Sequence, residues 1–215
     1  MNQIELSKMD KKRALEEIAE KMSKCQRCPL YKNATNSVPG EGNPEAEIMF
    51  IGEGPGYHED QRGIPFCGQA GKLIDELLQS IEVKREEVFI GNVLKHRPPE
   101  NRDPLPEEIE ACRVWLDKQI EIIQPKIIIT LGRFSMAKFI PEGKISSLHG
   151  QARFVDFEGR KYIVIPMFHP AAALRSLEIM SKIKEDFKKI PKMLTIKEKP
   201  VSVETQNGAQ LALFG

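Results

Sequence analysis

The chain of 215 residues lacks the features that mark membrane and secreted proteins. No stretch approaches the roughly 18 consecutive apolar residues that a membrane helix needs. The segment from Met1 to Met9 has no apolar core of the kind that a signal peptide carries. We therefore expect a cytoplasmic protein without membrane contact. Cysteine is also scarce, with four in the chain, and cytoplasmic cysteines usually stay reduced or bind metal.

An excess of charge of either sign is absent too, because 32 Lys and Arg balance 31 Asp and Glu. The net charge of +1 argues against a protein that coats nucleic acid nonspecifically, but it is compatible with a local basic face. Two groups of cations could form such a face: Lys95, Arg97 and Arg102 in one loop, and Arg175, Lys182, Lys184, Lys188 and Lys189 further on. Ordinary solvated helix surfaces would give the same pattern, so both interpretations stay open.

Short runs rich in Ile and Val are what the sequence does contain, and they are typical of strands covered on both faces. These runs are Glu47–Gly52, Val88–Val93, Lys126–Leu131 and Tyr162–Met167. Helical spacing separates or flanks them at Asp10–Lys24, Ala70–Ile81, Pro106–Ile123, Arg133–Phe139 and Ala171–Ile190. Strands that alternate with helices predict an α/β fold, a three-layer α/β/α sandwich around a central four-stranded parallel sheet.

The end of the chain loses this periodicity. We expect a single domain over residues 1–192 and a flexible tail over residues 193–215. The tail ends in the apolar hexamer Gln210-Leu211-Ala212-Leu213-Phe214-Gly215. Such a segment could dock on a partner such as a sliding clamp, and a frayed or domain-packed tail is the alternative.

The loops that follow the predicted strands are where a ligand should bind, because parallel sheets bind ligands at the carboxyl ends of their strands. Glu53 and Gly54 follow the first strand, in a glycine-rich turn that leaves room for a ligand. Phe66, between a proline and a glycine, can lie flat against a base. Asn92 ends the second strand, and its amide offers the donor and the acceptor needed to read a pyrimidine edge.

The loop after the fourth strand adds a histidine and a helix start. His169 can donate a hydrogen bond to charge that develops on a carbonyl oxygen. Small residues from Ala171 onward open a helix, so that Leu174 could wedge into a base stack and backbone N–H groups near Arg175 could meet phosphate. Each residue alone is more often part of a turn, a cap or a core than of a site.

Taken together, these residues resemble the uracil-DNA glycosylase superfamily, specifically its thermostable iron–sulfur group called family 4. The resemblance covers roughly residues 25–190, and each motif follows a predicted strand. Its carriers are Gly52-Glu53-Gly54-Pro55-Gly56 with Glu59-Asp60, Gly63-Ile64-Pro65-Phe66, Asn92 before Lys95, and His169-Pro170-Ala171-Ala172. As a set they are highly specific.

The resemblance implies a monofunctional glycosylase that flips uracil out of double- or single-stranded DNA and leaves an abasic site, a step of base excision repair. By this resemblance Glu53 positions the water or steadies the cationic sugar, and His169 stabilises the uracil anion. Phe66 stacks on the base, Asn92 reads its edge and Gly54 borders the pocket. The segment with Ala171, Leu174 and Arg175 fills the vacated stack. A mismatch glycosylase that accepts thymine or hypoxanthine, and a noncatalytic iron–sulfur DNA-binding module, are the alternatives.

The family also holds a [4Fe–4S] cluster on four cysteines. Cys25, Cys28 and Cys112 match three of these positions, whereas His96 stands at the remaining one. Imidazole can replace a thiolate on such clusters, and we favour His96 as the fourth ligand over Cys67, which lies beside Phe66. Zinc on the same four side chains is a further alternative. We expect the cluster to be structural, and we interpret His58 and His149 as surface or structural histidines.

Overall fold

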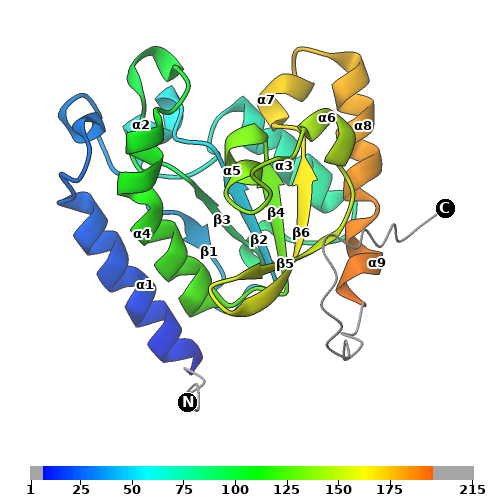
Figure 1. Cartoon of the computed structure of the whole chain (residues 1–215), viewed down its shortest axis with the longest axis horizontal. Coiled ribbons are helices and arrows are strands. Elements are labelled where there is room, and N and C mark those ends of the chain that lie inside the picture. Colours follow the sequence, from blue (N-terminus) through cyan, green and yellow to red (C-terminus); the bar gives the residue numbers. More distant parts are fainter. Residues whose placement is uncertain (1–6, 196–215) are drawn as a thin grey trace.

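A computed structural model describes residues 7–195 of the protein. Its centre is a parallel sheet of four strands, β2 (Ile48–Gly52), β3 (Phe89–Asn92), β4 (Ile127–Leu131) and β6 (Arg160–Met167). They lie in the order β3-β2-β4-β6 and every neighbouring pair is parallel. The predicted α/β class and the central four-stranded parallel sheet are therefore confirmed. In Figure 1 the carboxyl ends of these strands point toward the top.

Two further strands, which the sequence did not predict, extend the sheet to six. Strand β1 (Glu41–Gly42) pairs antiparallel with β3, and β5 (Arg153–Phe157) pairs antiparallel with β6. Two residues are too few to give β1 a pattern. Strand β5 is an edge strand with half-buried and exposed side chains in alternation, so it lacks the continuous apolar run of the central strands.

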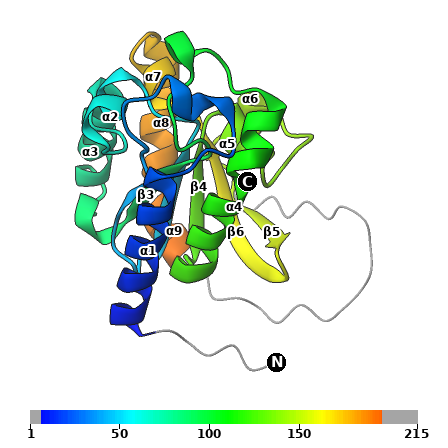
Figure 2. The ribbon, with the colours of Figure 1, turned by 90° about the vertical axis from the view of Figure 1, so that its left-hand side faces the viewer.

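Helices cover both faces of the sheet, as expected for three layers (Figures 1 and 2). One face packs against α3 (Gln69–Gln79), α8 (Leu177–Phe187) and α9 (Ile190–Leu194). The other packs against α4 (Pro106–Ile123) and the chain that follows α5 (Arg133–Ala137). Successive side chains of a strand serve opposite layers, and Phe50 and Met49 are an example.

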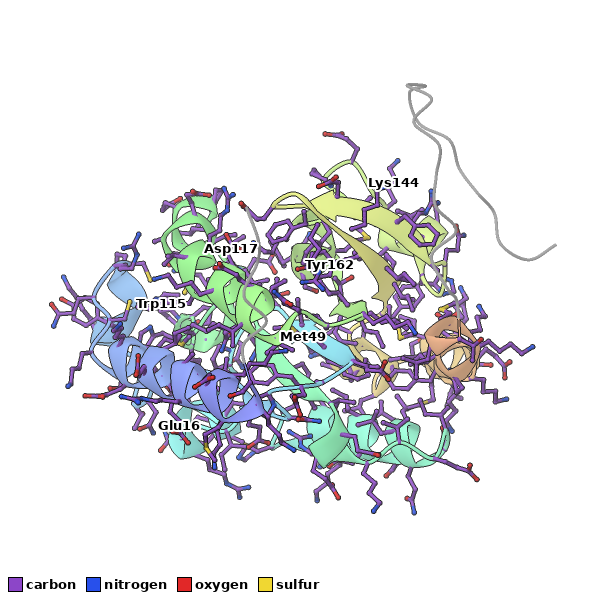
Figure 3. All side chains as sticks on the ribbon, turned by 90° about the horizontal axis from the view of Figure 1, so that it is seen from below. Glu16, Met49, Trp115, Asp117, Lys144 and Tyr162 are labelled. Carbon is purple, nitrogen blue, oxygen red and sulfur yellow. The ribbon has the colours of Figure 1, made fainter. Side chains whose placement is uncertain are left out.

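The first helix, α1 (Lys8–Ser23), lies outside α4 and packs against it. Its N-terminus is capped by Ser7, whose hydroxyl accepts from the backbone N–H of Asp10. Ile18 and Met22 of α1 join Trp115 of α4 in a separate apolar cluster. Figure 3, seen from below, shows Trp115 in this region beside α1, while Met49 and Tyr162 lie nearer the sheet.

The helix expected over Ala171–Ile190 is in fact three helices, α7 (Pro170–Ala173), α8 and α9. Helix α7 ends at its C-cap Leu174. Ser176 then caps the N-terminus of α8, because its hydroxyl accepts a hydrogen bond from the backbone N–H of Ile179. Helical spacing continues across the break, which is why periodicity alone did not reveal it. Short elements that escaped prediction are α2 (Tyr57–Arg62), α6 (Ile145–Leu148) and the 3-10 turns η1 (Pro29–Lys32), η2 (Arg85–Glu87) and η3 (Pro99–Asn101).

Within residues 7–195, none of the helices combines the length and the apolar composition that crossing a membrane requires. The last helix of the described residues, α9, ends at Leu194, and its Met193 packs into the core. The apolar hexamer at 210–215, and with it the expected clamp contact, lies outside the described residues.

Candidate functional site

A cavity of about 320 Å³ opens at the carboxyl ends of β2, β3 and β6, where the sequence predicted a site. It collects residues from all three predicted loops. The predicted residues that line it are Glu53, Gly54, Phe66, Asn92, His169, Ala171 and Arg175. Residues that sequence reasoning gave no role here include Glu59, Pro98, Asn101 and Arg102. Leu174 does not line the cavity and stands beside it with its side chain half exposed.

Phe66 forms part of the cavity wall and lies in a turn with a strained backbone conformation. Its φ is +48°, in the left-handed region that residues other than glycine rarely adopt. The buried ring lies 5.8 Å from the His169 ring, with 29° between the two planes. A Cβ on Gly52 would come within 2.5 Å of this ring, so only glycine fits beneath it. The cavity therefore has a fixed aromatic face.

Asn92 is buried at the end of β3. Its Oδ1 receives no hydrogen bond from any residue that the structure describes. This oxygen lies close to the ring of Phe66, because both groups would meet a Cβ added to Gly52. A buried acceptor without a partner is costly, and a donor on a bound ligand would satisfy it.

Lys95 holds the backbone behind Asn92. The side chain is fully buried, and its Nζ donates to the carbonyl of Asn92 at 2.9 Å and to Gln119 Oε1 at 2.7 Å. The idea that Lys95 contributes to an exposed basic face is therefore wrong. The sequence alone could not reveal this role, because it depends on Gln119, which lies on another element.

His169 caps α7 with its ring. Nδ1 accepts a hydrogen bond from the backbone N–H of Ala171 at 3.1 Å, so the proton of the neutral ring sits on Nε2. Burial, and to a smaller extent the charge of Arg175, lowers the pKa of His169 to about 4. The imidazole is therefore a neutral donor near pH 7, with its orientation set by the backbone.

Glu53 is one of two acidic residues that line the cavity, and it is partly buried. Burial and then the negative charge of Asp103 raise the pKa of its carboxyl, and Arg133 opposes them. Asp103 and Arg133 also form an ion pair with each other. Glu53 therefore sits beside a pair of opposite charges that pull its pKa in opposite directions.

Glu59 is the main residue of the cavity that the sequence gave no specific role. Its Oε1 accepts from the backbone N–H of Cys67 at 2.9 Å and of Gly68 at 3.0 Å. These N–H groups directly follow Phe66 and lie just before α3, whose N-cap is Gly68. A glutamate seven residues before the aromatic residue of a turn leaves no periodic signal that could have identified this contact.

Cations stand around the rim of the cavity, although fewer than predicted. Arg102 pairs with the buried Glu108 at 2.6 Å, and Arg97 lies over the exposed ring of Tyr57, 5.2 Å from its centre. Among the lysines of the second group, Lys182, Lys188 and Lys189 pair with carboxylates of their own helix region. These three lysines thus fit the solvated-surface interpretation better than a basic face.

The two remaining histidines lie apart from the cavity lining. His149 pairs through Nδ1 with the buried Asp186 Oδ2 at 2.7 Å, and its ring packs on Phe168. His58 is exposed and makes an edge contact with the ring of Tyr57.

Three of the four cysteines gather where α1 ends against α4, and we call Cys25, Cys28 and Cys112 the cysteine corner. Burial raises the pKa of the Cys112 thiol to about 11, and the neighbouring Cys28 and Cys25 raise it as well. Two N–H groups point at these sulfurs: Trp115 Nε1 donates to Cys25 at 3.3 Å, and the backbone of Lys95 donates to Cys112 at 3.4 Å. Such contacts are typical around metal-bound thiolates.

His96 and Cys67 lie in different surroundings. His96 shares a small cavity of about 130 Å³ with Cys25, whereas Cys67 lies beside Glu59 and Arg62 on the Phe66 turn. Across residues 7–195, no three His, Cys, Asp or Glu side chains surround one point closely enough for a single ion. A [4Fe–4S] cluster binds each ligand through a different iron, so its ligands need not surround one point.

Comparison with known proteins agrees with this geometry. Residues 39–194 match the family model of the uracil DNA glycosylase superfamily. The chain is 46% identical to a Type-4 uracil-DNA glycosylase of Sulfurisphaera tokodaii over 85% of this chain and 89% of the relative. It is 47% identical to one of Archaeoglobus fulgidus (82% and 92%) and 46% identical to one of Thermotoga maritima (81% and 92%). The chain therefore belongs to the uracil-DNA glycosylase superfamily, and within it to the type-4 enzymes.

Proposed function

We propose that this protein is a uracil-DNA glycosylase that hydrolyses the N-glycosidic bond of uracil flipped out of DNA. The observation that carries the proposal is one cavity of about 320 Å³ shared by Asn92, His169, Glu53 and the ring of Phe66. A stacked base is out of reach of any enzyme, so the nucleotide must first leave the helix, at a cost of a few kcal/mol. Excision of a damaged base is a DNA repair reaction.

Recognition of uracil rests on Phe66 and Asn92. The ring of Phe66 offers a face for stacking, and the unpartnered Oδ1 of Asn92 can accept from the N3–H of uracil. The amide NH₂ can then donate to O4. Cytosine has no N3–H and carries an amino group at C4, so it would leave both groups unmatched. The same amide therefore supports selection of uracil over cytosine.

His169 stabilises the leaving group in this proposal. When the glycosidic bond breaks, its electron pair goes to uracil, and negative charge spreads onto the O2 oxygen. The Nε2–H of a neutral imidazole can donate to that oxygen, because Nδ1 is engaged by Ala171 and the pKa is about 4. A preorganised donor of this kind acts where charge develops and needs no rearrangement.

Glu53 serves the other half of the reaction. The sugar becomes cationic as uracil leaves, and an ionised carboxylate offsets that charge or takes a proton from the attacking water. The hydroxyl of this water ends on the sugar carbon and its proton ends on uracil or in solvent. Burial raises the pKa of Glu53, so its carboxylate is poorly compensated in the free protein, and a cation that develops on the nearby sugar would stabilise it.

DNA contact is assigned to the loop after β6. Leu174 is 46% exposed beside the cavity, where it can fill the gap left by the flipped base. Ala171 and Arg175 line the cavity mouth, and the exposed Arg175 can meet phosphate. We further expect the enzyme to work in the cytoplasm on double- or single-stranded DNA.

The cysteine corner and His96 are the proposed ligands of a [4Fe–4S] cluster. The donor set fits, because three thiols are gathered in an apolar cluster and two of them, Cys25 and Cys112, receive N–H hydrogen bonds. His96 is favoured over Cys67 because it neighbours Cys25, while Cys67 neighbours Glu59. When bound, the cluster would tie α1 to α4 and to the loop after β3, a structural role.

Uracil release by Asn92→Ala, His169→Ala and Glu53→Gln tests the proposal. We expect each variant to lose activity by about a hundredfold or more on U:G and U:A duplexes. His58→Ala and Glu107→Gln, at exposed positions, are matched controls and should keep full activity. T:G and hypoxanthine duplexes define the base range. DNA binding without release of any base, or full activity in all three variants, would contradict the proposal.

Metal and sulfide analysis tests the cluster. We expect iron and inorganic sulfide in about equal amounts and a brown absorbance band, whereas zinc alone would contradict the cluster. His96→Cys should keep the iron content. Loss of iron in Cys67→Ala would instead identify Cys67 as the fourth ligand.

A further inference from the structure

Arg85, outside the cavity lining, joins three parts of the molecule with one guanidinium group. Nη2 donates to the carbonyl of Pro65 at 2.8 Å and to Glu41 Oε1 at 3.1 Å. Nη1 donates to Asp75 Oδ1 at 2.9 Å. Its side chain is 25% exposed, so these hydrogen bonds are partly shielded from water. The arginine thus connects η2 with β1, with α3 and with the residue just before Phe66.

The turn at Phe66 needs support from outside, because its own conformation is unfavourable. A residue other than glycine with φ near +48° keeps that conformation only where its surroundings hold it. The backbone here also approaches α3 closely, since a Cβ on Gly71 would lie 1.6 Å from the carbonyl oxygen of Phe66. Small shifts of this turn would rotate the ring.

Polar contacts fix the turn on both sides of Phe66. Before it, the carbonyl of Pro65 is held by Arg85. After it, the N–H groups of Cys67 and Gly68 are held by Glu59. The orientation of the peptide between Pro65 and Phe66 sets the φ of Phe66, so the contact of Arg85 acts directly on the strained angle. Glu59 lines the cavity and could touch the substrate, whereas Arg85 stands behind the turn and is not part of the lining.

We infer that Arg85 is a positioning residue that holds the Phe66 ring at the angle needed to stack on the flipped base. This inference rests on the proposed stacking role of Phe66. Glu41 and Asp75 contribute by orienting the guanidinium, so that one of its N–H groups points at Pro65. A ring fixed in advance spares the complex the entropy of ordering it. The benefit therefore falls on binding of the base rather than on the breaking of the bond.

The test compares Arg85→Met with wild type in steady-state uracil release and in inhibition by free uracil. We expect KM and the inhibition constant for uracil each to rise about tenfold, while kcat changes by less than about twofold. Arg113→Met is the matched control, because Arg113, on α4, likewise contacts three groups, the carboxylates of Glu110, Asp117 and Glu158, whereas Arg85 contacts two carboxylates and one carbonyl. A merely structural role would lower the melting temperature in both variants and leave the uracil constant unchanged, which would overturn the inference.

A double-mutant cycle with Phe66→Leu separates the two claims. If Arg85 acts through the ring, Arg85→Met should have little further effect in the Phe66→Leu background. An undiminished effect there would overturn the inference while leaving the role of Phe66 intact. If Phe66→Leu alone leaves KM and the uracil constant unchanged, the stacking role fails first. If Arg85→Met does not fold, Arg85→Lys replaces it in the test. We expect Arg85→Lys to raise the inhibition constant for uracil about threefold, because one ammonium group cannot hold the carbonyl and both carboxylates. An unchanged inhibition constant would overturn the inference.

Discussion

The cavity and the cysteine corner are neighbours, but the cavity contains strained and unpaired groups, whereas the corner is well packed. Both draw on the end of β3: Asn92 belongs to the cavity, and His96, four residues on, neighbours Cys25. In the cavity, Phe66 is held at a positive φ and the Oδ1 of Asn92 lacks a partner among the described residues. In the corner, the thiols are packed with Met22, Leu94 and Trp115, and two of them receive hydrogen bonds.

The two regions therefore differ in how they affect the stability of the free protein. Strain and unmatched polar groups cost the free protein stability, and they persist where a ligand makes use of them. The corner would have no such cost if its thiols hold the proposed cluster. Lys95 links the two regions, because its backbone N–H donates to Cys112 and its ammonium group donates to the carbonyl of Asn92. Substitutions on the two sides should therefore affect different measured quantities.

Gly52→Ala should have the largest effect on the cavity. The new Cβ would lie 2.3 Å from Asn92 Oδ1 and 2.5 Å from Phe66 Cζ, so it would displace both groups that hold the base. We expect kcat/KM for uracil release to fall about a thousandfold, since displacements near 1 Å can cost about a hundredfold each. Gly91→Ala is the control, because its Cβ would meet nothing closer than 3.6 Å. Equal losses in both variants would mean that glycine loss damages the sheet in general.

Cys112→Ser should have the opposite signature. Loss of a cluster ligand removes the tie between α1 and α4, and we expect the unfolding midpoint to fall by about 10 °C. The rate per folded molecule at low temperature should stay within about threefold of wild type. Emission from Trp115, the only tryptophan of the chain, should rise because its indole lies beside Cys25 and would lose a quenching cluster. The control Cys67→Ser should change neither the unfolding midpoint nor the Trp115 emission. If Cys112→Ser instead loses much of its rate while its unfolding midpoint stays unchanged, the two regions do not differ in the way proposed.

The same contrast explains how far the fold followed from the sequence. The four central strands are buried on both faces, and continuous apolar runs such as Ile127–Leu131 predict them. Strand β5 is only half covered at the sheet edge and β1 has two residues, so neither leaves a run. The break between α7 and α8 was missed because apolar spacing continues through Leu174, and only Ser176 signals a new start.

The sequence could predict the residues of the candidate site only where a residue's place relative to a strand determines where it lies in the fold. Glu53, Asn92 and His169 lie at or just after the carboxyl ends of β2, β3 and β6, and the parallel sheet brings these ends to one cavity. Lys95 and Arg85 could not be recognised in this way, because their partners are distant in the sequence. Lys95 reaches Gln119, 24 positions away, and Arg85 reaches Glu41, 44 positions away. The sequence alone does not distinguish a cation that donates hydrogen bonds to buried carbonyls from a cation on the surface.

Leu174→Ala should give a smaller effect that depends on the form of the DNA. Its side chain stands half exposed beside the cavity, so on a duplex it can replace the extruded base in the stack. We expect release from duplex DNA to fall about tenfold and release from single-stranded DNA to change by less than about twofold. Met9→Ala, which removes another exposed apolar side chain at the far end of α1, should change neither rate. Equal losses on both substrates would contradict a wedge role.

The smallest predicted effect lies in the pH dependence, and it tests whether Glu53 is governed by its two charged neighbours. His169, with a pKa of about 4, stays neutral through the working range, so the fall in rate toward acid should follow protonation of Glu53. The Glu53 pKa is raised by burial and then by Asp103, and it is lowered by Arg133. Asp103→Asn should therefore move the fall in kcat to lower pH, and Arg133→Met should move it to higher pH. Both variants break the same ion pair, so a loss of that pair alone would shift the two profiles in the same direction, and only the charge of each residue predicts opposite shifts.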